Sequence, residues 1–158
     1  MANKFFTYES TPVCTTAECT AGQVLTPTLV KLLTGVRGGS SVRLVNVTVV
    51  DYEDKGKDLA IQFFMKNAGG AIGVGGAAPN ISDANLALNV PLGAVNLRHS
   101  TSGDLTASQV WSAINMDMVL TSSDDAVEGE IYYNVCAAET IDLASASSYT
   151  FRFGFEIS

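Results

Sequence analysis

The chain has 158 residues, of which 47% are hydrophobic and 16% are charged, and its formal net charge is −7. This composition predicts a single globular domain and excludes an intrinsically disordered protein. Lysine and arginine are scattered, which argues against a nucleic acid partner, and no apolar run approaches the roughly 20 residues that cross a membrane.

Residues 1–23 are predicted to be either an extended arm or the first strand of the domain. Phe5, Phe6 and Tyr8 are close together in this segment, and in an arm they would anchor it on a neighbouring molecule. The first residues lack the apolar core of roughly 7–15 residues found in signal peptides, so we expect synthesis in the cytoplasm.

The three cysteines fit no metal-binding spacing. Cys14 and Cys19 form a C-x4-C pair without a second pair, Cys136 is distant in sequence, and the single histidine, His99, is distant from all three. Two alternatives follow: a small Cys14–Cys19 disulfide loop, or three reduced thiols.

The first half of the chain contains two clear strand patterns. "GQVLTPTLVKLL", residues 22–33, suits a helix and a strand equally well. In "VRLVNVTVV", residues 42–50, alternation predicts that Val45, Val47 and Val49 share one face. "LAIQFFMK", residues 59–66, predicts an inward face of Leu59, Ile61, Phe63 and Met65.

The charged segment "DYEDKGKD", residues 51–58, joins these two strands. A calcium loop that began at Asp51 would need a ligand at Lys55, which is a cation, and an acid/base pair would need a cleft that shifts a carboxyl pKa. Gly56 suits a turn. The segment therefore predicts a solvated hairpin turn in preference to a metal site or a catalytic pair.

A glycine-rich stretch and one short helix follow. Residues 68–78 are predicted to be a flexible surface loop. In "APNISDANLALNVP", residues 78–91, Asn80 or Ser82 can cap a helix, Asp83 suits its positive end, and Pro91 prevents its continuation.

The second half of the chain again alternates. "GAVNLR", residues 93–98, is a short strand candidate. "SAINMDMVL", residues 112–120, places Ile114, Met116, Met118 and Leu120 on one face, and "EIYYNVC", residues 130–136, does the same with Ile131, Tyr133 and Val135. The clearest strand is "YTFRFGFEIS", whose apolar face is Tyr149, Phe151, Phe153, Phe155 and Ile157.

Several short strands with polar turns and almost no helix predict an all-β fold. We expect an antiparallel β-sandwich or a jelly-roll-like fold with at most one or two short helices, in a single domain over residues 24–158. The sequence contains no G-x-S-x-G motif whose serine His99 could activate. We therefore expect that the protein is not an enzyme and that it has no catalytic residue, no cofactor, no metal and no small-molecule substrate.

The order of several short motifs carries a family resemblance. From "GGSSVRLVNVTVVDYEDKGKDLAIQFFMKN" through "AAPNISDANLA" to "YTFRFGFEIS", the sequence resembles small virion proteins of tailed bacteriophages, some of which are head decoration, or cement, proteins. The resemblance covers residues 38–157, apart from residues 92–123, which match no pattern. It brings no catalytic residues.

The resemblance implies a decoration protein on the capsid exterior, whose partners are the major capsid protein and further copies of itself. The expected contact residues are Phe5, Phe6 and Tyr8 near the N-terminus, and Ile72, Val74 and Ile81 around the glycine-rich loop. The alternative is a carbohydrate- or receptor-binding module on a tail, which predicts exposed aromatic side chains at Trp111, Tyr132 and Tyr133.

Overall fold

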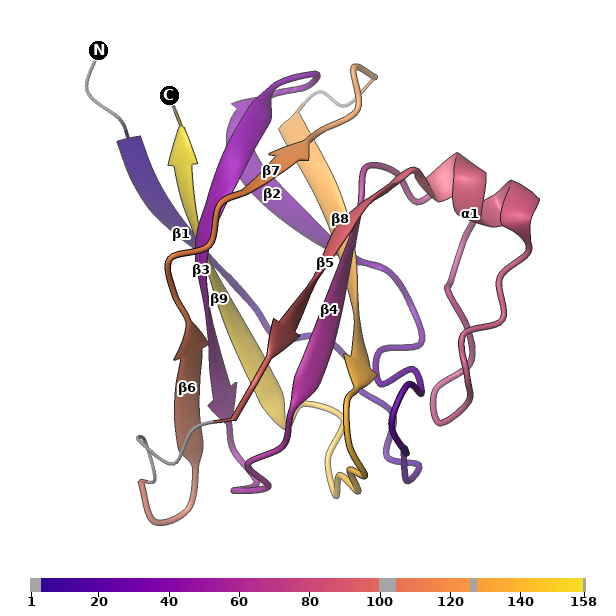
Figure 1. Cartoon of the computed structure of the whole chain (residues 1–158), viewed down its shortest axis with the longest axis vertical. Coiled ribbons are helices and arrows are strands. Elements are labelled where there is room, and N and C mark those ends of the chain that lie inside the picture. Colours follow the sequence, from indigo (N-terminus) through magenta and orange to yellow (C-terminus); the bar gives the residue numbers. More distant parts are fainter. Residues whose placement is uncertain (1–3, 100–104, 126–127, 158) are drawn as a thin grey trace.

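Two antiparallel β-sheets pack face to face in the computed structural model, which describes residues 4–99, 105–125 and 128–157 (Figure 1). The first sheet has the order β1 (Lys4–Ser10), β9 (Tyr149–Ile157), β3 (Ser41–Asp51) and β6 (Gln109–Ala113), and β7 (Met118–Thr121) also pairs with β3. The second sheet has the order β2 (Val30–Arg37), β8 (Glu128–Ala137), β4 (Leu59–Phe64) and β5 (Pro91–Leu97). With one short helix, α1 (Asp83–Asn89), the predicted all-β sandwich is confirmed.

The strand pairs are nested from the ends of the chain toward its middle. β1 pairs with β9, β2 with β8, β3 with β6 and β7, and β4 with β5, and every pair is antiparallel. The chain is thus a long hairpin of four strand pairs, rolled so that β3 also meets β9 and β4 also meets β8. This is a jelly roll in which β6 and β7 are two halves of one strand.

The core lies between the sheets and is rich in aromatic rings. Phe153 of β9 lies 6.0 Å from Phe63 of β4 and 5.0 Å from Tyr133 of β8, between ring centroids. The inward faces predicted for β8 and β9 are confirmed, and so is that of β4 as far as Phe63; Met65 follows the end of the strand and is half-buried.

The inward face predicted for β3 is wrong at Val45. Its pairing with β9 shifts between Leu44 and Asn46, so Val45 is the extra residue of a bulge. Val42 and Leu44 are buried before the bulge, and the alternation changes phase after it. Val47 and Val49 are buried as predicted.

The single strand predicted over residues 112–120 is also wrong. Asn115 has φ 58°, a left-handed conformation that ends β6 before β7 begins. Ile114 is therefore 68% exposed, whereas Leu120 on β7 is buried.

The helix lies where the capping residues and Pro91 in the sequence predict it. Ser82 is its N-cap and accepts a hydrogen bond from Asn85 N at 3.2 Å, and Val90 at φ 55° closes the C-terminal end just before Pro91. The ambiguous residues 22–33 form no helix, and β2 begins at Val30.

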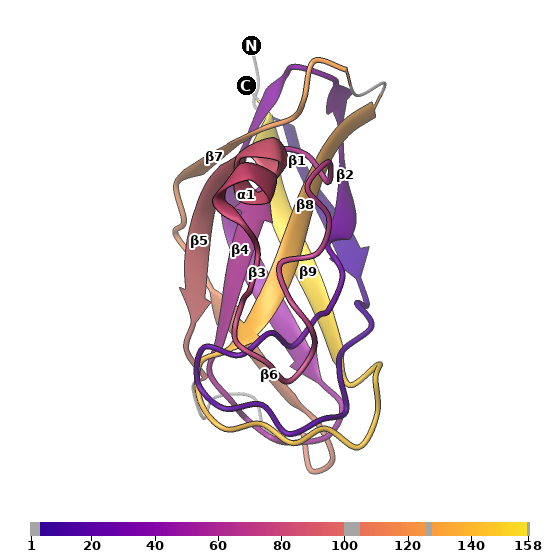
Figure 2. The ribbon, with the colours of Figure 1, turned by 90° about the vertical axis from the view of Figure 1, so that its right-hand side faces the viewer.

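The two sheets differ in what covers their outer faces. Figure 2 shows α1 and the chain that precedes it in front of the second sheet. A small apolar cluster fills the space beneath them, built from Leu29, Phe64 and Ile72 with Ile81, Leu86 and Tyr132. The described residues contain no helix with the length and apolarity to cross a bilayer.

Candidate interaction surface

The charged segment after β3 is a structural element. It does not form a hairpin, because β3 belongs to the first sheet and β4 to the second. Nor is it solvated throughout: Asp51 is fully buried, and its carboxylate accepts hydrogen bonds from the N–H groups of Glu53, Lys55 and Gly56 at 2.9, 2.8 and 2.9 Å. The carboxylate thereby fixes the backbone of the loop that crosses between the sheets.

Glu53 holds a second loop. Its carboxylate accepts hydrogen bonds from the N–H groups of Ala144 and Ser145 at 2.8 Å each, and from the hydroxyl of Ser148. Burial raises the pKa of Glu53, but these hydrogen bonds and the nearby Lys55 ammonium outweigh it and bring the pKa below its usual value. The carboxylate stays ionised and cross-links residues 144–148 to the end of β3.

His99 is held in a network of hydrogen bonds. Its backbone N–H donates to Asp58 Oδ1 at 2.6 Å, and its ring Nε2 contacts Gln109 Oε1. Gln109 Nε2 in turn donates to Asp54 Oδ1 at 2.5 Å, and the histidine ring meets the Trp111 ring edge-on at 5.3 Å. These contacts connect the segment after β5, which carries His99, to the beginning of β6.

Metal-ligating side chains are dispersed. Over residues 4–99, 105–125 and 128–157, no group of three or more His, Cys, Asp or Glu side chains is placed to hold an ion. Cys14, Cys19 and Cys136 are free, buried thiols, which resolves the alternative left by the sequence. Burial, with smaller contributions from Cys19 and Glu53, raises the pKa of Cys14 to about 12.

The predicted contact residues fall into two separate groups. Phe5, Phe6 and Tyr8 lie on β1; Phe5 is 68% exposed, while Phe6 stacks on Phe155 at 5.2 Å and is half-buried like Tyr8. The others lie in the chain over the outer face of the second sheet, where Val74 is 74% exposed, Ile81 is half-buried and Ile72 is only 3% exposed. Because Ile72 belongs to the apolar cluster beneath α1, its side chain does not reach the surface.

The glycine-rich loop that carries Val74 is fixed by the chain beside it. Val24 N donates to Ala77 O at 2.9 Å, and Gly76 N donates to Val24 O at 2.9 Å. Gly75 lies against Thr15, where a Cβ would come within 2.6 Å of the Thr15 Cβ. The loop predicted to be a flexible surface segment is therefore tied to residues 15–24 by its backbone.

The outer face of the first sheet is not covered by α1 or by the chain that precedes it. We call this the open face, and its outward side chains come from all five strands: Phe5, Thr7, Arg43, Asn46, Thr48, Ser112, Val119 and Arg152. Val119 is 60% exposed, and Ile114 lies just beyond the end of β6. Sequence patterns did not indicate Val119 or Ile114, because alternation assigned Ile114 to the core and said nothing of Val119.

The charges on the open face are paired within it. Arg152 Nε binds Glu9 Oε2 at 2.7 Å, and Arg43 binds Glu156 as well as Asp117 Oδ1, the latter at 3.3 Å. A shallow hollow of about 160 Å³ lies beside Gly154, between Phe5 and Asn46. The open face thus presents apolar side chains among charged side chains that pair with one another.

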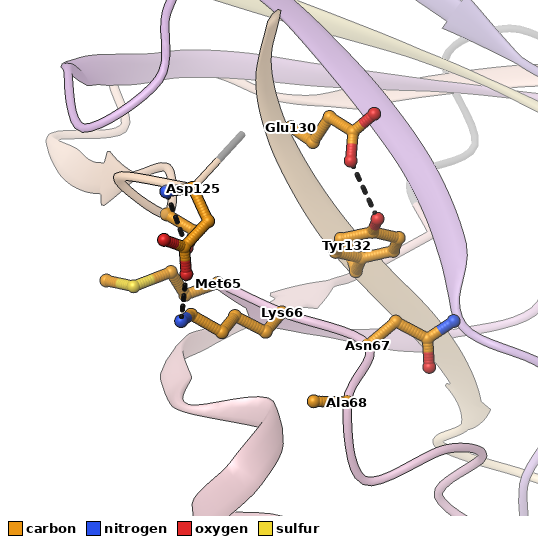
Figure 3. Close-up of a pocket in the computed structure, with 8 residues that line it drawn as sticks. Met65, Lys66, Asn67, Ala68, Asp125, Glu130 and Tyr132 are labelled. Carbon is orange, nitrogen blue, oxygen red and sulfur yellow. Dashed lines mark hydrogen bonds and ion pairs between the residues drawn. The ribbon is translucent and has the colours of Figure 1, made fainter. Parts of the chain in front are cut away.

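A polar groove of about 380 Å³ lies beside the first half of β8 (Figure 3). Tyr132 Oη donates to Glu130 at 2.9 Å on one side, and Lys66 Nζ binds Asp125 at 3.1 Å on the other. The two other aromatic residues considered for sugar binding are not available, because Trp111 is 3% exposed and Tyr133 is fully buried.

Comparisons with known proteins found only remote likenesses. No family model and no curated protein matches the sequence. The chain is similar to a chain of the T13 IBDV viral particle with a TM-score of 0.37 and 8% identity, over 98% of this chain and 31% of that one. It is similar to turnip yellow mosaic virus with a TM-score of 0.32 and 10% identity, over 99% and 80% of the two chains, and to Israeli acute paralysis virus with a TM-score of 0.28 and 9% identity, over 98% and 68%. Likenesses this remote carry no information about what the chain does.

Proposed function

We propose that the protein is a non-enzymatic structural protein of a tailed-bacteriophage virion, which decorates the head exterior and cements it. It binds the major capsid protein and further copies of itself. The observation that carries this proposal is the open face: a sheet surface with exposed Phe5 and Val119 and with its arginines already paired. The resemblance of the sequence motifs to phage virion proteins supports the same role.

The size of the molecule is sufficient for such contacts. A specific interface covers about 800 Å² on each partner. The accessible surface of the described residues is 7840 Å², so one such contact would use about a tenth of it. Repeated contacts on a lattice then add avidity without any deep pocket. Because the charges of the open face are paired within the face, a partner need not supply counter-charges for them.

Mass spectrometry of purified virions tests the role. We expect the protein at lattice-scale copy number in heads, with no enzymatic turnover required for head stability. Its absence from heads would refute the role.

Binding to undecorated heads tests the surface. Val119→Lys adds a charge to the open face and should weaken head binding by at least about tenfold. Val74→Lys is the matched control, because Val74 is at least as exposed as Val119 but lies over the second sheet, and it should bind like the wild type. Equal loss in both variants would contradict the assignment of the open face.

A tail-associated carbohydrate- or receptor-binding module is the second candidate. It is favoured by the polar groove, where the Tyr132 ring lies beside Glu130, Asn67 and Lys66 and could orient a polyhydroxylated ligand. A tail location predicts about a dozen copies per particle, in keeping with the symmetry of a tail, against hundreds for a head protein.

A further inference from the structure

Three of the four sheet edges are interrupted. In the second sheet, β5 begins with Pro91 and its register with β4 shifts at Phe63, and the register of β2 with β8 shifts between Leu33 and Arg37. In the first sheet, the edge opposite β1 is broken between β6 and β7. Prolines, bulges and breaks are the usual means by which proteins prevent open edges from pairing with other chains.

The β1 edge has none of these protections. It pairs with β9 over seven consecutive residues without a register shift, and it contains no proline. In the described part of the chain, β1 makes backbone hydrogen bonds only to β9, which leaves the groups on its other side open. Figure 1 shows β1 at the margin of the molecule, beside the N-terminus.

We propose that β1 pairs antiparallel with β1 of a second copy, about a two-fold axis that passes through Thr7. The two first sheets then form one continuous sheet. Thr7 is the central residue of the strand, so this register pairs the full length of both strands. It also keeps the outward set of each copy, Phe5, Thr7 and Glu9, on one face of the joined sheet.

The strand is complementary to itself in this register. Phe6 lies opposite Tyr8 of the second copy, and the two-fold symmetry places Tyr8 opposite Phe6 of the second copy as well. Aromatic cross-strand pairs of this kind stabilise sheets. Both side chains are only half-buried in the single chain, so the second copy would cover them. Lys4 lies opposite Ser10 and Phe5 opposite Glu9, so no like charges face each other.

Charge favours a second copy in spite of the net charge of −7. The β1 strand carries one lysine and one glutamate, Lys4 and Glu9, and is neutral as a whole. Glu9 is already paired with Arg152. The strand that would meet its own copy therefore carries no net charge.

This inference deepens the proposed contact between copies by naming the strand that makes it, and the pairing requires no virion. A failure of the pairing would leave a head-binding monomer, and a failure of head binding would leave a dimer in solution. The two proposals are therefore tested separately.

Sedimentation at increasing protein concentration tests the pairing, with Thr7→Lys and Thr7→Glu as the variants. Thr7 is exposed and faces Gly154, so both side chains fit the single chain, which a thermal melt verifies. In the proposed register residue 7 faces itself, so each variant places like charges opposite each other and should raise the dimer dissociation constant by at least about tenfold.

An equimolar mixture of the two variants places Lys opposite Glu, and we expect it to restore the dimer. Leu88→Lys is the matched control, since it adds the same charge at an exposed position of α1, away from the β1 edge and the open face, and should remain dimeric. A monomeric wild type, a dimeric Thr7→Lys variant, or a mixture that stays monomeric would each overturn the proposal.

Discussion

At the scale of single residues, two acidic side chains at the end of β3 organise the loops around them. Asp51 binds the loop that crosses to the second sheet, and Glu53 binds residues 144–148. The sequence shows both residues as part of a charged cluster of a kind typical of solvated turns. What distinguishes them is that Asp51 is buried and Glu53 is half-buried, and that both carboxylates accept hydrogen bonds from backbone N–H groups.

Removal of the Asp51 carboxylate should therefore destabilise the fold. Asp51→Ala leaves three N–H groups without their acceptor, and we expect the free energy of unfolding to fall by about 2 to 4 kcal/mol. Urea denaturation measures the change. Asp142→Ala is the control, because it removes the same charge from an exposed position and should change the free energy of unfolding by less than about 0.5 kcal/mol. A similar loss in both variants would assign the effect to net charge.

Glu53 predicts a dependence of stability on pH. Because its pKa in the folded protein lies below its ordinary value of 4.5, its contribution is complete above about pH 4.5 and is lost as the pH falls through the folded pKa. Glu53→Gln should be less stable than the wild type by about 1 to 2 kcal/mol at pH 7, and the difference should narrow as the pH falls from 4.5 toward 3. Urea denaturation over this pH range measures both proteins. If the difference in unfolding free energy between the two proteins stayed constant from pH 7 to pH 3, this role of the carboxylate would be contradicted.

At the scale of elements, backbone irregularities decide which side chains face the core. The bulge at Val45 changes the phase of β3, so that Leu44 and Val47 are both buried although they are three residues apart. Simple alternation cannot include such a step, because the extra residue is defined only by the pairing with β9. In β8 and β9 the side chains predicted to face inward are buried, apart from Ile157, which is half-buried.

The break between β6 and β7 depends on Asn115. Its left-handed conformation is accessible to asparagine and glycine but costs a β-branched residue about 1 to 2 kcal/mol. We expect Asn115→Val to lower the melting temperature and Asn115→Gly to leave it close to that of the wild type. Differential scanning calorimetry measures the pair. Equal effects of the two substitutions would indicate that the asparagine side chain, and not its backbone conformation, is what matters.

At the scale of the whole molecule, the reactivity of the thiols reports on global unfolding. All three cysteines are buried, and at a pKa of about 12 Cys14 has about a thousandfold less thiolate than a cysteine at its ordinary value of 9.0. We expect iodoacetamide at pH 8 to modify none of the three thiols in the folded protein and all three in urea. Mass spectrometry counts the modified sites. Rapid modification of Cys19 or Cys136 alone would show that residues 15–24 open without the rest of the fold.

The whole molecule also decides which surfaces are available to partners. The sequence suggested two groups of contact residues with no means of telling them apart. In the fold, one group lies on an unprotected edge strand, while α1 and the chain before it carry the other group, and Ile72 within it is buried. The open face and the β1 edge exist because the nested pairing places the first and last strands together at one margin of the first sheet.

The sequence by itself determined the features that depend on neighbours within a few residues. These are the alternating strands at residues 59–64, 128–137 and 149–157, the Ser82 cap of α1, and hence the all-β class. The tertiary structure alone decided the rest: the jelly-roll pairing, the phase change at Val45, the burial of Asp51 and Ile72, and the exposure of Val119. The physical reason is that these features arise from contacts between strands far apart in the chain, and no local pattern of side chains specifies which strand will lie alongside which.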